Sequence, residues 1–257
     1  LQLATEEYYR CMIFCSSDYE NSTMRPKLVI EYKIKESHQA PISNVRKISA
    51  TQGGFTGKLD ARDAFNNLQV IGDIDGDGIE DLAVGSNDDD GAVDAGAVYI
   101  LFMNKDRTVK NYQKISALEG NFHGSLDSED FFGRDITPIG DFDGDGVIDI
   151  AVGAWGDDDV SGAGAVWILF LNSNGTVKNY QKISATQGGL VGLTANRQFG
   201  FSVTSLGDLN GDGITDIAVG SPTYDNDGGL YRGCVWILFL NRDGTVKSQQ
   251  KINDYQG

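Results

Sequence analysis

Three short acidic loops contain the residues with the clearest chemistry: DIDGDGIED, DFDGDGVID and DLNGDGITD. Each has an oxygen-bearing side chain at its first, third, fifth and ninth positions, and glycine at the fourth and sixth. Calcium takes about six to eight oxygen ligands, and alternate residues of a tightly turned loop can point inward at one ion. The sequence therefore predicts about three calcium sites. The predicted ligands are Asp73, Asp75, Asp77, Asp81 and the carbonyl of Ile79 in the first loop, Asp141, Asp143, Asp145, Asp149 and the carbonyl of Val147 in the second, and Asp208, Asn210, Asp212, Asp216 and the carbonyl of Ile214 in the third.

These loops differ from EF-hand loops, which end in a glutamate at the twelfth position and lead into a helix. Here the twelfth position holds Val84, Val152 or Val219. An apolar run rich in β-forming residues follows each loop, so the loop leads into a strand. The alternative is a set of hairpin turns without metal, but four carboxylates packed together would repel one another without a cation. Because protein ligands fill the loops, we expect a structural rather than a catalytic ion.

Composition narrows the functional classes. The 257 residues include 21 basic and 37 acidic ones, for a net charge of −16, which argues against binding to nucleic acid or an anionic membrane surface. No apolar run reaches the roughly 18 residues of a membrane span. The two histidines, His38 and His123, are not repeated, and the chain has no nucleophile-elbow, zinc-protease or phosphate-loop motif. We therefore expect a protein that is not an enzyme.

A repeat organises most of the chain. The sequence KISA begins at Lys47, Lys114 and Lys182 and returns as KIND at Lys251, a period of 67 to 69 residues. Such a period indicates one supersecondary unit used three times, with repeats at about 51–117, 118–185 and 186–254. Each repeat contains four strand-like runs, and the acidic loop lies between the first and second.

The third run of each repeat is apolar on both faces: GAVYILFM, GAVWILFL and GCVWILFL. A strand of this kind must be covered on both sides, which stacked four-stranded sheets about an axis provide. The predicted fold class is therefore all-β, a partial β-propeller of three four-stranded blades. Cys234, in the place of Ala97 and Ala165, is expected to be a buried small residue.

The repeats resemble the FG-GAP repeats of integrin α-subunit propellers and their bacterial relatives. The resemblance covers about residues 44–257 and rests on Phe132-Gly133 and Phe199-Gly200, on Gly96-Ala97-Val98 and Gly164-Ala165-Val166, and on the acidic loops between these motifs. The chain departs from the pattern at Phe65-Asn66 and Gly233-Cys234-Val235, and valine replaces the proline of the second motif throughout.

Propellers usually have about four to eight blades. Three repeats are therefore expected to form an open arc with an exposed edge, and we expect further blades of the same propeller outside this chain.

The N-terminal part differs in character. Residues 1–37 are expected to form one or two strands, YYRCMIF and KLVIEYKI. The stretch RCMIFCSSDYENSTMRPKLVIEY resembles the closing strands of DNRLRE-type β-sandwich modules, which are extracellular and in some cases bind carbohydrate. Residues 38–43 are expected to be a linker.

Ligand binding is predicted on the face opposite the calcium loops, where longer and more varied loops gather. The equivalent surface of integrins contacts the partner subunit and ligand, and the resemblance implies that a ligand would bind here too. Trp155 breaks the repeat pattern, so it is expected either to stack on a ligand or to pack against the neighbouring blade. The acidic clusters have a plainer alternative as solvated loops. The candidates are Asp88, Asp89, Asp90, Trp155, Asp157, Asp158, Asp159, Tyr224, Asp225, Tyr231 and Arg232.

The resemblance implies a calcium-binding adhesion or recognition module, secreted or at the cell surface, which binds a protein or glycan. Two alternatives stay open. One is a noncatalytic accessory propeller of a secreted polysaccharide-degrading enzyme. The other is a structural spacer, which would explain the repeats but not the varied loops.

Overall fold

The computed structural model describes residues 28–29, 45–59, 63, 65–86, 94–157, 159–223 and 232–253. Strands are the regular elements of these segments, and none of them contains a helix long and apolar enough to cross a membrane. Strand β1 (Leu28–Val29) pairs antiparallel with β2 (Lys47–Ile48). The rest of the predicted N-terminal module and its linker lie outside the described residues.

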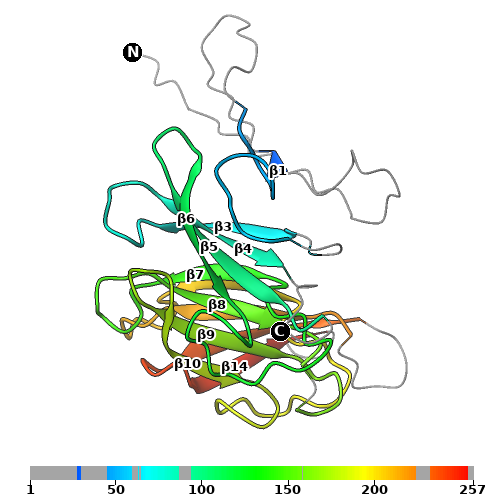
Figure 1. Cartoon of the computed structure of the whole chain (residues 1–257). Coiled ribbons are helices and arrows are strands. Elements are labelled where there is room, and N and C mark those ends of the chain that lie inside the picture. Colours follow the sequence, from blue (N-terminus) through cyan, green and yellow to red (C-terminus); the bar gives the residue numbers. More distant parts are fainter. Residues whose placement is uncertain are drawn as a thin grey trace, which may run out of the picture.

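Three four-stranded antiparallel sheets form the main body (Figure 1), and in each the strands are paired in sequence order. This meander confirms the predicted fold class, a partial β-propeller of four-stranded blades. The first blade contains β3 (Asn67–Gly72), β4 (Asp81–Ser86), β5 (Ala97–Met103) and β6 (Val109–Ile115). The second contains β7 (Ile136–Gly140), β8 (Asp149–Ala154), β9 (Ala165–Leu171) and β10 (Val177–Ile183), and the third contains β11 (Ser202–Gly207), β12 (Asp216–Ser221), β13 (Cys234–Leu240) and β14 (Val246–Ile252).

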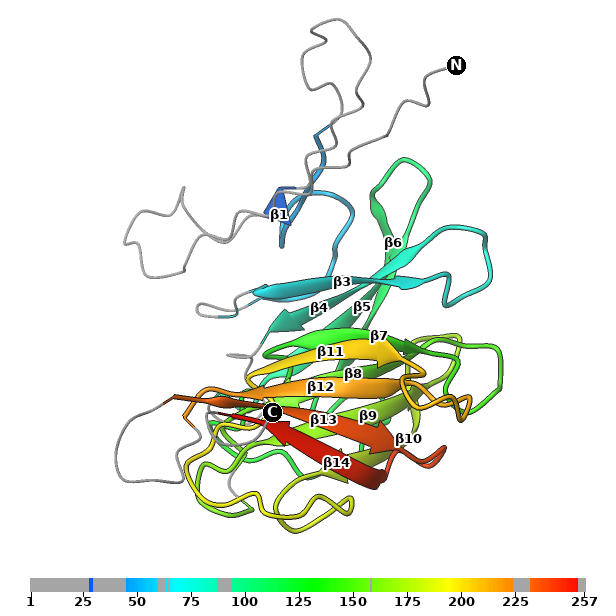
Figure 2. The same ribbon diagram turned by 180° about the vertical axis from the view of Figure 1, so that it is seen from behind.

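The first strands of the three blades lie side by side, as Figure 2 shows for β3, β7 and β11. Asp135, just before β7, connects them: its carboxylate accepts hydrogen bonds from the Asn67 side chain and, at 2.8 Å, from the backbone N–H of Val203. Burial raises the pKa of Asp135, and these hydrogen bonds oppose the shift. One partly buried carboxylate thus joins all three blades.

The third strands of the first two blades, β5 and β9, are buried on both faces, as their composition predicts. In β5, Val98, Ile100 and Phe102 pack in the core between the first and second blades, and the alternate residues pack in a separate core on the other face. Strand β13 differs, because Val235 is 41% exposed although its equivalents Val98 and Val166 are 0% exposed. The outer face of the third blade is therefore open among the described residues. Cys234 is buried, as predicted.

The Phe-Gly and Gly-Ala motifs meet at the junctions between blades. Phe132 is completely buried, pairs with Gly96 of the preceding blade in a parallel bridge, and its N–H donates to the carbonyl of Ala95 at 2.9 Å. Gly96 has a φ of +92°, and a Cβ there would lie 2.1 Å from the Phe132 carbonyl oxygen. Only glycine fits this contact. Phe199 and Gly164 repeat it between the second and third blades.

Candidate functional site

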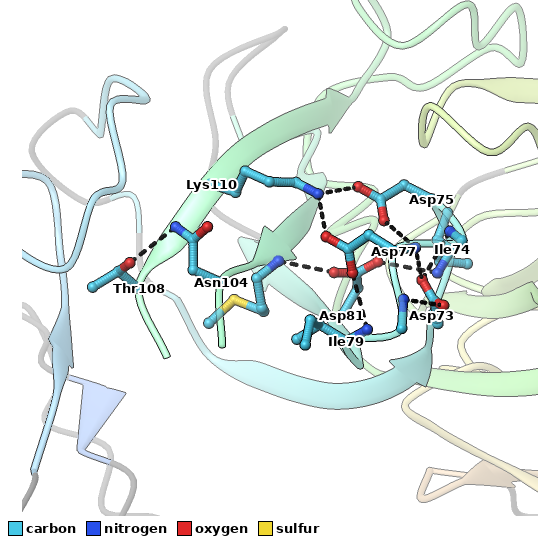
Figure 3. Close-up of polar contacts among 12 residues, drawn as sticks. Asp73, Ile74, Asp75, Asp77, Ile79, Asp81, Asn104, Thr108 and Lys110 are labelled. Carbon is cyan, nitrogen blue, oxygen red and sulfur yellow. Dashed lines mark hydrogen bonds and ion pairs between the residues drawn. The ribbon is translucent and has the colours of Figure 1, made fainter. Parts of the chain in front are cut away.

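Each of the three acidic loops connects the first and second strands of its blade, and all three lie at the same end of the blades. In the first loop, Asp73 arranges the turn (Figure 3): its Oδ1 accepts the N–H groups of Gly76 at 2.8 Å and Asp77 at 3.0 Å, and its Oδ2 accepts that of Gly78 at 2.8 Å. Asp208 makes the same three bonds in the third loop. The loop is therefore already turned around its first carboxylate.

The ninth carboxylate anchors each loop to the sheet. Asp81 is the first residue of β4 and is buried; its Oδ2 accepts the N–H of Ile74 at 3.0 Å and its Oδ1 that of Met103, in β5, at 2.8 Å. Burial raises the pKa of Asp81, and the negative charges of Asp75 and Asp77 add to this against the opposing hydrogen bonds. Burial likewise raises the pKa of Asp149 to about 6. These buried carboxylates lack full compensation of their charge, which a bound cation would supply.

The oxygen atoms fit a hard divalent cation. One carboxylate oxygen each from Asp73, Asp75 and Asp81 lies within 4.8 Å of the others, and the second loop repeats this arrangement. The third loop has the same turn, with the neutral Asn210 at its third position. The predicted ligands would hold calcium through their oxygens, and the ion would neutralise and cross-link the loop.

One lysine of each blade lies against the acidic loop, a feature absent from the sequence-based prediction. Lys110 Nζ is 2.6 Å from Asp75 Oδ2 and also contacts Asp77 Oδ2 (Figure 3). Hydrogen bonds to these two carboxylates raise the pKa of Lys110, and the bond from Lys110 lowers the pKa of Asp77. The sequence did contain a sign of this contact, because a lysine follows the first valine of the fourth strand in every repeat, as Lys110, Lys178 and Lys247.

Trp155 lies at the opposite end of the blade, directly after β8. Its ring stacks on Phe131 with centroids 4.6 Å apart and planes at 4°, and its centroid is 6.2 Å from that of Phe201, in the third blade. The Arg134 guanidinium lies 4.3 Å from the Phe201 ring centroid. Trp155 thus packs against the neighbouring blade, one of its two predicted roles, and stays partly exposed.

A pocket of about 650 Å³ opens beside this aromatic stack at the junction of the second and third blades. Its lining includes four non-glycine residues with positive φ, which costs about 1–3 kcal/mol each and is concentrated at functional sites. These residues are Glu129 (+67°), Phe131 (+54°), Asn196 (+58°) and Gln198 (+51°).

Asp157 and Asp159 have internal partners. The Asp157 side chain is 2% exposed and lies 2.6 Å from the Nζ of Lys182, itself 6% exposed. Lys182 is also 3.0 Å from Asp159, whose carboxylate accepts hydrogen bonds from Ser184 and Thr186. The structure therefore places Asp157 in the interior, within a cluster that ties the loop after β8 to the end of β10, and does not present it to a ligand in solution.

Among the other ligand candidates, Arg232 lies in a separate pocket beside β12 and β13. The remaining candidates, Asp88, Asp89, Asp90, Asp158, Tyr224, Asp225 and Tyr231, lie outside the described residues. The pocket beside Trp155 draws mainly on residues that the sequence did not indicate, because their positions depend on how two blades meet.

Known proteins show related sequences. The model of the FG-GAP repeat family matches residues 70–101 and 199–238. Integrin alpha-PS2 of Drosophila melanogaster is 32% identical over 167 residues, which cover 63% of this chain and 12% of that protein. Integrin alpha-3 of Cricetulus griseus is 33% identical over 163 residues, 61% of this chain and 14% of that protein. Integrin alpha-6 of Gallus gallus is 38% identical over 140 residues, 53% of this chain and 12% of that protein. The chain thus spans a small part of these relatives.

Proposed function

We propose that this chain, with its FG-GAP repeats and its similarity to integrin alpha chains, is a calcium-stabilised recognition module of a secreted or cell-surface protein. The observation that carries the proposal is the difference between the loops at the two ends of the blades. One end repeats the same oxygen-rich loop three times, whereas the other holds varied loops and a pocket. Repetition suits a structural ion, and variation suits recognition of a ligand.

The variant Asp145→Ala tests whether calcium binding to the acidic loops stabilises the chain. A site filled to about 100 times its dissociation constant contributes about 2.7 kcal/mol to stability. Loss of that site should lower the melting temperature in millimolar calcium by about 5–10 °C, since 1 kcal/mol corresponds to about 2–4 °C in a chain of this size. In EDTA the loss should be smaller, because there the variant gives up only the contact between Asp145 and Lys178 and the hydrogen bond from the N–H of Val147. Equal losses in both buffers would show that Asp145 supports the loop without metal.

We propose that a protein or glycan ligand binds in the pocket beside Trp155. Flat aromatic faces beside hydroxyl and amide groups can bind a sugar or a side chain of a partner, and the lining offers Trp155 together with Ser161 and Asn196. The strained backbone at Glu129 and Gln198 supports a site whose shape has been maintained at a cost in stability.

Binding to a panel of polysaccharides and matrix proteins, in calcium and in EDTA, tests this assignment. We expect calcium-dependent binding that Trp155→Ala weakens. Ser161→Arg should also weaken it, because Ser161 is an exposed pocket residue whose replacement fills the pocket and leaves the aromatic stack intact. Lys105→Ala, in the exposed hairpin between β5 and β6 on the calcium side, is the control that should bind normally. Normal binding by Ser161→Arg would place the ligand elsewhere.

The open face of the third blade fits a further blade of the same kind. At both junctions inside the structure, the equivalents of Val235 are fully covered by the next blade. We therefore expect the isolated chain to associate in sedimentation velocity runs, and Val235→Lys to suppress this. A wild-type chain that stays monomeric and binds no hydrophobic dye would contradict this assignment.

A further inference from the structure

Each acidic loop has a lysine of its own blade beside it: Lys110, Lys178 or Lys247. We propose that these lysines are intramolecular counter-cations, which neutralise the loop in the absence of calcium and must withdraw when calcium binds. The inference rests on the proposed calcium sites and adds a determinant of their affinity that lies outside the loop.

The two oxygen atoms of each carboxylate in the loop have different partners. In the first loop, Oδ1 of Asp75 accepts the N–H of Asp77 at 3.2 Å, and Oδ1 of Asp77 accepts the N–H of Ile79 at 2.9 Å. The turn therefore uses one oxygen of each carboxylate and leaves Oδ2 for a cation. Lys110 Nζ contacts both Oδ2 atoms, that of Asp75 at 2.6 Å (Figure 3). Lysine and calcium would thus draw on the same two oxygens.

The second and third loops repeat the arrangement. Lys178 Nζ is 2.5 Å from Asp143 Oδ2 and contacts Asp145 Oδ2. Lys247 Nζ is 2.8 Å from Asp212 Oδ2, but the third position of this loop is the neutral Asn210. The lysine therefore bridges two carboxylates in the first and second loops and pairs with one in the third.

The site of attachment explains why one residue can take this role in every blade. The fourth strand pairs only with the third, so its other edge is free within the blade, and its first residues lie beside the acidic loop at the same end of the sheet. A lysine chain is long and flexible and ends in a compact charge. It can reach the loop carboxylates without fixing their geometry, and it can swing into solvent when another cation arrives.

Two consequences follow. Without calcium, the lysine should reduce the repulsion among the loop carboxylates and so stabilise the blade. With calcium, the lysine should act as a competitor, so its removal should strengthen calcium binding. A lysine that instead supported the occupied loop would have the opposite effect on calcium affinity.

Lys178→Met in the full chain tests both consequences, because methionine keeps the length and apolar body of the side chain and removes its charge. We expect the melting temperature in EDTA to fall by about 2–5 °C. Titration calorimetry with calcium chloride should show one of the sites binding about two- to tenfold more tightly. Lys178→Arg keeps the charge and should retain the stability in EDTA, and Lys105→Met, at an exposed position of the β5–β6 hairpin, is the matched control.

The third loop provides a graded comparison. Lys247→Met removes one ion pair instead of two, so both effects should be smaller than in Lys178→Met. Unchanged stability in EDTA, or calcium binding that is unchanged or weaker in Lys178→Met, would overturn the proposal. If the wild-type chain binds no calcium, both the proposed calcium sites and the competition between lysine and calcium are refuted. The comparison in EDTA would still decide whether the lysine neutralises the loop.

Discussion

Gly153, in β8, lies at a close approach between the backbones of the second and third blades, and its replacement tests how tightly this junction is packed. A Cβ at Gly153 would lie 2.1 Å from the carbonyl oxygen of Gly200 and 3.1 Å from its carbonyl carbon. Both are backbone atoms of the next blade. Gly153→Ala must therefore push two backbones apart by about 1 Å to restore ordinary contact distances.

The cost follows from how firmly the junction is held. Moving Gly200 away would disrupt the junction, because the Phe199 beside it is fully buried and donates its N–H to the carbonyl of Ala163, in the second blade, at 2.9 Å. Overpacking in such a site costs about 1–3 kcal/mol. Replacement of glycine also restricts the unfolded chain, which returns about 0.4–1 kcal/mol. We expect a net loss of about 1–2 kcal/mol.

Gly220 provides a matched control, because it occupies the same position in the third blade. A Cβ there would meet the Ser202 Oγ at 2.3 Å, a side-chain atom that can rotate away, and the next nearest atom is at 3.6 Å. In thermal unfolding at saturating calcium, Gly153→Ala should lower the melting temperature by about 2–8 °C, and Gly220→Ala should leave it unchanged or slightly raised. Equal effects of the two substitutions would refute the packing argument.

Two further predictions concern the cluster beneath the loop after β8. Lys182→Met should lower the free energy of unfolding by about 3–5 kcal/mol, because it leaves the Asp157 carboxylate buried without its cation; the double variant with Asp157→Asn should recover most of this in urea unfolding, and no recovery would contradict the pairing. Burial raises the pKa of Asp130 from 3.8 to about 7, so the folded state binds this proton more tightly than the unfolded state does. Its contribution to stability is complete below about pH 4 and is lost as the pH rises to about 7. At saturating calcium, the stability difference between the wild type and Asp130→Asn should therefore decline across this range, and a constant difference would contradict the assignment.

The strands and the acidic loops could be predicted from the sequence because both are local and repeated. The alternation of side chains in AVYILFM requires cover on two faces, and the structure provides it with a separate core on each side of β5. The carboxylates at alternate positions of the loop from Asp73 to Asp81 are close together because one short turn brings them there. In both cases, the residues that make contact belong to one short segment or to a regular period.

Contacts between segments were harder to predict. Lys110 lies 35 residues after Asp75, and only the pairing of β5 with β6 brings its side chain to the loop. The repetition of this lysine indicated that it has a role, but not which group it contacts. Asp157 appeared as one of three successive acidic residues on a varied loop, and the depth of its carboxylate depends on Lys182, near the end of β10.

The departures from the FG-GAP pattern become intelligible once the motif is understood as a junction between blades. Gly133 needs its glycine because a Cβ would lie 2.3 Å from the Ala97 carbonyl of the preceding blade, and its φ is +89°. Asn66 occupies the same position in the first blade, where the described residues provide no preceding blade to collide with. At the other end, the three atoms nearest to a Cβ on Gly233 all belong to its own blade, the nearest at 3.2 Å, and Cys234 replaces the alanine of the motif. The motif is therefore strictest where two blades press backbone against backbone, and it relaxes on the faces that have no neighbour among the described residues.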